Sequence, residues 1–75
     1  MKRLRVNTKD ATHNELVRLA RKCGFIVISG SRHDIVKTIN DKFITLIPRH
    51  NKIKRELAKG IVEAFVDFGA DVTFN

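Results

Sequence analysis

The chain has 75 residues, enough for one domain (residues 1–75), and folding at this size buries only about 60–65% of the unfolded chain's surface. Fifteen Lys and Arg against eight Asp and Glu give a net charge of +7 and an isoelectric point near 10.2, which favours polyanionic partners. The longest apolar run, Phe25 to Ile28, is too short to cross a bilayer, and Cys23 has no second cysteine to pair with. We therefore expect a cytoplasmic domain with no membrane partner.

A basic N-terminal segment, Met1 to Ala11, precedes the first predicted helix. Thr12 and Glu15 have the spacing of a capping box, and Gly24 suits a left-handed helix end. Between them the apolar residues recur at helical spacing: Leu16, Leu19, Ala20 and Cys23. This pattern predicts a helix from His13 to Cys23, with His13 at the surface.

Three short strands follow, at Phe25 to Ser29, His33 to Ile39 and Phe43 to Ile47, because each is rich in β-branched or apolar residues. Asn40-Asp41-Lys42 has the chemistry of a hairpin turn. Both alternating sets of the first strand are apolar, so the pattern does not decide which set faces the helices.

A hairpin reversing at Asn40-Asp41 brings two motifs to one end of the sheet, Gly30-Ser31-Arg32-His33 and Ile47-Pro48-Arg49-His50. Paired residue numbers then sum to about 81 or 82, which places His33 opposite Pro48 or Arg49. Imidazole, hydroxyl and guanidinium groups collected in this way are suited to handling a phosphodiester.

The second predicted helix is amphipathic, with an apolar stripe of Leu57, Ile61, Ala64, Phe65 and Phe68. Gly60 is expected in its first turn, where a close approach to a ligand would justify a glycine, and Gly69 ends the helix. Ala70 to Asn75 is a tail or a short extra strand.

Taken together, these motifs resemble the HicA family of toxins from about Thr12 to Gly69. The resemblance is carried by Gly24-Phe25, Gly30-Ser31-x-His33, Ile47-Pro48-Arg49-His50 and Glu56-Leu57-x-Lys59-Gly60 in that order. The chain departs from the family pattern at Arg32, where many members have a first histidine, in the longer interval between the motifs, and in its tail.

The resemblance implies an α+β fold of the double-stranded-RNA-binding-domain type, ordered α-β-β-β-α, in which a three-stranded antiparallel sheet carries two helices on one face. It also implies an endoribonuclease that cleaves messenger RNA and arrests translation, the toxin of a type II toxin–antitoxin system. A HicB-type antitoxin would neutralise it in a hetero-oligomer. The histidine of the Gly-Ser-x-His motif is catalytic in the family, and it corresponds to His33.

Metal-independent RNA cleavage needs a proton-transfer group and cations that stabilise the phosphorane, and an imidazole suits the first task. We predict His33 as the proton-transfer residue, or as a strand-end histidine that only hydrogen-bonds the turn. His50 is either a second proton-transfer group or a structural residue. The residues predicted to contact phosphate or stabilise charge are Ser31, Arg32, Lys37, Arg49, Lys52, Lys54, Arg55 and Lys59.

The basic residues around the second helix start serve to anchor phosphate or to receive an acidic antitoxin. No cofactor or metal is expected, because no pair among His13, Cys23, His33 and His50 has zinc-ligand spacing on one element. The alternative function is a non-catalytic RNA- or DNA-binding module of the same fold.

Overall fold

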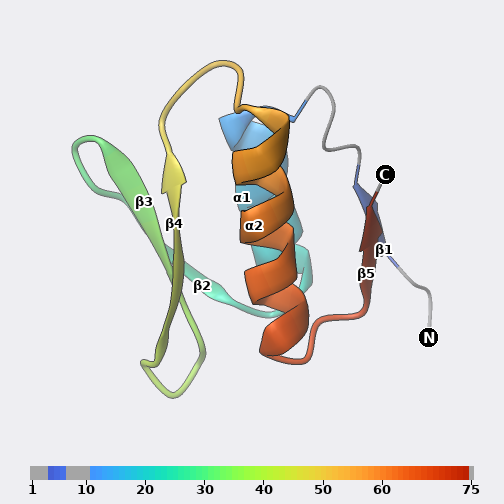
Figure 1. The fold of residues 1–75 in the computed structure, drawn as a ribbon. Helices are drawn as coiled ribbons and strands as arrows, with labels where there is room; N and C mark the ends of the chain where they lie inside the picture. Colours follow the sequence, from blue (N-terminus) through green and yellow to red (C-terminus); the bar gives the residue numbers. More distant parts are fainter. Residues whose placement is uncertain (1–3, 7–10, 75) are drawn as a thin grey trace.

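The computed structural model of the chain describes residues 4–6 and 11–74. Its elements are β1 (Leu4–Val6), α1 (His13–Lys22), β2 (Ile26–Ile28), β3 (His33–Lys37), β4 (Phe43–Pro48), α2 (Arg55–Asp67) and β5 (Val72–Phe74). Strands β2, β3 and β4 form one antiparallel sheet in that order, and both helices pack on one of its faces (Figure 1). The predicted α-β-β-β-α order and α+β class are confirmed for the helices and the three-stranded sheet, whereas the double-stranded-RNA-binding-domain type stays a prediction. Neither helix of the described part is long and apolar enough to span a membrane.

Helix α1 begins and ends where the sequence predicts, within one residue. The Thr12 hydroxyl accepts a hydrogen bond from the Glu15 backbone N–H at 3.2 Å and donates one to the Glu15 carboxylate at 3.2 Å. At the other end Gly24 has a φ of +84°, a left-handed conformation that favours glycine. The N-terminal cap fixes the position of His13, the first residue of the helix.

The register of the hairpin between β3 and β4 places His33 opposite Pro48 and Asp34 opposite Ile47. This is the predicted pairing, in which residue numbers sum to about 81. The register shifts between Val36 and Lys37, close to a turn in which Asp41 has a φ of 68°. The irregularity lies at the turn end of the hairpin, so the pairing at the opposite end, where the two motifs meet, is unaffected.

The sheet has one buried and one open face. Val36 and Ile47 are buried against the helices, in the same core cluster as Leu16 and Phe65. The other face, which we call the outer face, exposes Ile26, Ile28, Phe43 and Leu46 by 41–56% each. The alternation pattern of the first strand did not decide which of its residues face the helices. In the structure Val27 pairs with Val36 on the inner side, and Ile26 and Ile28 lie on the outer face.

A second, two-stranded sheet lies beyond the helices. Strand β5 pairs in parallel with β1, with Leu4 opposite Val72 and Val6 opposite Phe74. Figure 1 shows this pair on the side of the helices away from the three-stranded sheet. Of the two possibilities for the tail, the extra strand is confirmed, and its partner was not predicted. Residues 1–3 and 7–10 of the predicted basic N-terminal segment, and residue 75 of the tail, lie outside the described part.

The position of Gly60 differs from the prediction. It lies in the second turn of α2, not the first, and a Cβ atom added there would meet nothing within 4 Å. Within the described residues, therefore, no neighbouring protein atom requires a glycine at this site. We expect Gly60→Ala to raise the free energy of unfolding by about 0.5–1 kcal/mol, since alanine loses less entropy in a helix.

Urea denaturation of the parent and Gly60→Ala proteins measures this gain. Gly24→Ala is the matched control and should lower stability, because Gly24 has a positive φ. A loss of stability in Gly60→Ala would contradict the regular helical environment described for this residue.

Candidate functional site

The two sequence motifs meet at one end of the β3–β4 hairpin, as predicted. The Arg49 backbone N–H donates to the Arg32 carbonyl at 3.1 Å, one step beyond the pairing of His33 with Pro48. The turn before β3 is tight, because a Cβ atom on Gly30 would lie 2.3 Å from the His33 carbonyl oxygen. Glycine is therefore needed at position 30 for the turn to close.

Asp34 is the centre of a buried polar network at this end of the sheet. Its side chain is only 4% exposed, because alternation along β3 directs it toward the helices. One carboxylate oxygen lies 2.5 Å from Nε2 of His13. The other lies 3.3 Å from Nε of Arg49 and accepts from the Gly30 N–H at 3.4 Å. This one carboxylate joins α1, the turn before β3 and the end of β4.

The surroundings of Asp34 lower its pKa. Burial alone would raise it, but the hydrogen bonds from His13 and Gly30 and the positive charge of Arg49 outweigh burial. The carboxylate is therefore charged in the folded protein at neutral pH. It orients both His13 and Arg49, and the Arg49 guanidinium is held a second time because its Nη1 donates to the Gly30 carbonyl at 3.0 Å.

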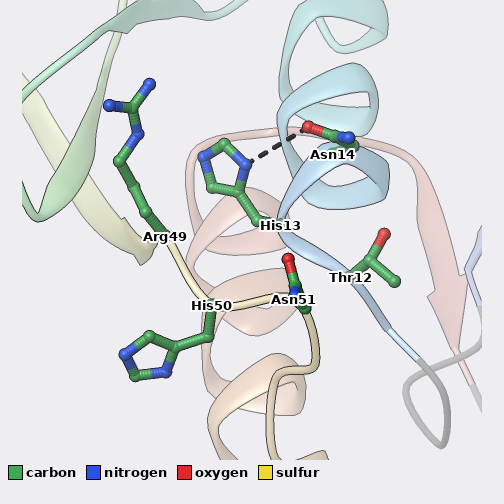
Figure 2. Close-up of a pocket in the computed structure, with 6 residues that line it drawn as sticks. All are labelled: Thr12, His13, Asn14, Arg49, His50 and Asn51. Carbon is green, nitrogen blue, oxygen red and sulfur yellow. Dashed lines mark hydrogen bonds between the residues drawn. The ribbon is translucent and has the colours of Figure 1, made fainter.

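A pocket of about 280 Å³ opens next to this network. It is lined by Thr12, His13, Asn14, Arg49, His50 and Asn51 (Figure 2). Figure 2 shows the His13 ring between Arg49 and Asn14, with its Nδ1 atom 3.3 Å from the Asn14 side-chain oxygen. All six lining residues are polar or basic, and they come from only two segments, the start of α1 and the connection that follows β4.

His33 occupies a separate position. It is exposed at the start of β3, and among the described residues its ring has no hydrogen-bond partner. Since successive side chains of a strand point to opposite faces, His33 lies on the face opposite Asp34. The Arg49 guanidinium is bound to Asp34, so the structure does not bring it to the His33 ring. The predicted alternative in which His33 hydrogen-bonds the turn has no such bond to support it.

The other predicted site residues are spread along the hairpin. Ser31 and Arg32 are exposed in the turn that precedes His33. Lys37 lies at the far end of β3 and pairs with Asp41 at 3.0 Å. It is four residues from His33 on the same strand, a separation of roughly 13 Å, so it stands apart from that histidine.

The predicted phosphate-anchoring residues lie in and after the connection between β4 and α2. Lys52, Lys54 and Arg55 are exposed and line a small hollow of about 220 Å³ together with the buried Ile53. Lys59 is half-buried further along α2. His50 is exposed and lines the larger pocket, two residues before this basic segment begins.

Sequence reasoning missed His13 and Asp34. His13 was expected at the surface, but its side chain is only 18% exposed and bonded to Asp34. The sequence carried one signal. Asp34 and Val36 are two residues apart in a predicted strand, so the Asp34 carboxylate is expected on the same face as the apolar Val36, toward the core. A buried carboxylate needs hydrogen-bond or ion-pair partners, so this position predicts that basic side chains lie close to it in the fold.

No protein-family model, curated protein or solved structure matches this chain. The fold and the site define it as a small, strongly basic α+β domain. One end of its sheet carries an exposed histidine on one face and a carboxylate-held histidine and arginine on the other. Within the described residues, no group of three His, Cys, Asp or Glu side chains could hold a metal ion.

Proposed function

We propose that the protein is a HicA-type endoribonuclease that cleaves messenger RNA in the cytoplasm and arrests translation. The observation that carries the proposal is the exposed His33 ring, which has no partner among the described residues and follows directly on the exposed Arg32. An imidazole left free in a chain of net charge +7 is available for proton transfer on an anionic polymer.

In this mechanism His33 takes the proton of a ribose 2′-hydroxyl, and the 2′-oxygen attacks the adjacent phosphorus. The bond to the 5′-oxygen then breaks, and the leaving oxygen receives a proton from an acid. His33, once it holds the proton of the 2′-hydroxyl, is the candidate for that acid, since His50 lines the pocket on the other face of the sheet. Arg32 is the nearest cation in sequence to stabilise the charge on the phosphorane. Ser31, which is exposed, donates a hydrogen bond to a phosphate oxygen in this proposal.

The basic segment after β4 supplies the binding energy in this proposal. Lys52, Lys54 and Arg55 are exposed, and with Lys59 they provide up to four phosphate contacts. Each contact to single-stranded RNA contributes roughly −0.7 to the slope of log affinity against log salt. Four contacts would therefore give a slope of about −3.

A HicB-type antitoxin is the proposed protein partner. The outer face exposes Ile26, Ile28, Phe43 and Leu46, and a partner would remove this apolar area from water. The outward positions of β2, β3 and β4 carry no carboxylate but do include His33 and Lys37, so an acidic surface would complement them. A partner seated there would also cover His33.

The direct test is incubation of the purified full chain with messenger RNA in the presence of a chelator. We expect cleavage products that end in a 2′,3′-cyclic or 3′-phosphate, and growth arrest when the chain is expressed. Salt-sensitive binding with RNA that stays intact after long incubation would instead identify a non-catalytic RNA- or DNA-binding module, and would overturn the ribonuclease.

A further inference from the structure

We propose that the pocket between the start of α1 and the β4–α2 connection binds a phosphate group of the RNA chain, with His13 and Arg49 as its principal ligands. The inference rests on the proposed function for the identity of the polymer, but it concerns a different face of the sheet from His33. Its main ligand on α1, His13, was expected only as a surface residue.

The side chains that would donate hydrogen bonds to a ligand in this pocket are already held in position by other contacts. Asp34 is hydrogen-bonded to His13 Nε2 and ion-paired with Arg49 Nε, and the Gly30 carbonyl accepts from Arg49 Nη1. Among the described residues, the guanidinium makes one hydrogen bond, through Nη1, in addition to the ion pair of Nε with Asp34, and it has five N–H groups in all. The remaining donors stay available, and a forked, prepositioned guanidinium matches the oxygens of a phosphate.

Charge also favours an anion in this pocket. The Asp34 carboxylate is buried behind the two side chains that it holds, with 4% of its side chain exposed, whereas Arg49 is 44% exposed. The pocket therefore presents the cation and not the carboxylate to solvent. Asp34 holds Nε2 of His13, whereas Nδ1 has only an exposed contact of 3.3 Å with the Asn14 side-chain oxygen, which a phosphate oxygen would replace.

The pocket continues into the basic segment that follows it. Asn51 lines the pocket, and the exposed Lys52 and Lys54 follow it in the connection, with the buried Ile53 between them. A polymer with regularly spaced phosphates can occupy both places at once, which a single acidic side chain cannot. This continuity favours a polynucleotide over an acidic protein as the ligand.

The test measures binding without cleavage, using a fluorescent 2′-O-methyl RNA oligomer between about 50 and 200 mM salt. Arg49→Gln and His13→Gln should each weaken binding about tenfold, as expected for loss of a charge-assisted hydrogen bond. Arg49→Gln should also make the salt slope shallower by about 0.7. The matched control is Arg21→Gln, which removes one exposed charge near the opposite end of α1 and should change affinity less than twofold.

Asn51→Ala tests the pocket with a variant that is expected to fold even if the first two variants do not. Asn51 is exposed, and its side chain has no bonded partner among the described residues. It should weaken binding by about threefold. Equal effects of Arg49→Gln and Arg21→Gln, or an unchanged affinity in Asn51→Ala, would overturn the pocket. The pocket would also be overturned if these substitutions weakened the binding of a glutamate-rich peptide as much as the binding of RNA.

This experiment separates the two proposals. Binding of the modified oligomer through the pocket, together with ordinary RNA left intact, would refute the ribonuclease and leave the phosphate pocket standing. If all the pocket variants instead bound RNA with parental affinity and cleaved ordinary RNA, the phosphate pocket would be refuted and the ribonuclease would stand.

Discussion

Replacing His33 with alanine is expected to lower the rate of messenger RNA cleavage by about 10²–10⁴-fold, the usual contribution of one proton-transfer group. The melting temperature should not change, because the ring is exposed and bonded to no described residue. Affinity for the 2′-O-methyl oligomer should stay within a few-fold of the parent, since the basic segment and the pocket remain. Single-turnover cleavage, thermal melting and binding together measure these three outcomes.

Arg21→Ala is the control for nonspecific loss of activity. Arg21 is exposed in the last turn of α1, away from both motifs, and its removal should leave cleavage unchanged. His33→Gln tests whether proton transfer, and not hydrogen bonding alone, is needed, and it should be as inactive as His33→Ala. Undiminished cleavage by either His33 variant would remove the proposed mechanism.

Replacing Asp34 with alanine is expected to lower the free energy of unfolding by about 2–3 kcal/mol. The substitution removes the hydrogen-bond partner of His13 and the Gly30 N–H and the ion-pair partner of Arg49. It also leaves an opening at a site where the side chain is 4% exposed. Asp34→Asn keeps the shape of the side chain and one acceptor oxygen, so it should be less damaging. Urea denaturation at neutral pH measures the free energy of unfolding of the parent, Asp34→Asn and Asp34→Ala proteins, which should decrease in that order.

The pH dependence of stability provides a second measurement of the same network. Because the pKa of Asp34 is lowered in the folded state, its contribution is fully present above the ordinary carboxyl pKa of about 3.9. The contribution is lost as the pH falls from there through the lower folded-state pKa. The stability difference between the parent and Asp34→Asn should therefore shrink in acid, and a constant difference would contradict the assignment.

The fold was predictable because its local signals are strong. Thr12 and Gly24 delimit α1, and the Asn40-Asp41-Lys42 turn sets the hairpin register, which in turn brings the two motifs together. The pairing of β1 with β5 was not predictable, since the two strands lie at opposite ends of the chain and neither carries a signal for the other.

The candidate site was only half predictable. The sequence motifs led to His33 and Arg49, but they gave no indication that these two side chains occupy opposite faces of the sheet. The bond between His13 and Asp34 spans 21 positions, and it exists only because α1 packs on the inner face. Contacts of that kind depend on how helices and sheet are assembled, and no local pattern encodes them.

The parallel pairing of β1 with β5 also bears on how the chain is made. This contact closes a loop from Leu4 to Val72, whereas the β3–β4 hairpin closes over a handful of residues. The entropy of loop closure favours the short loop first. During synthesis α1 and the β3–β4 hairpin can form before β5 is available to pair with β1, because β5 follows β1 by 68 residues. A chaperone or a cotranslational binder would therefore find β1 unpaired in the nascent chain.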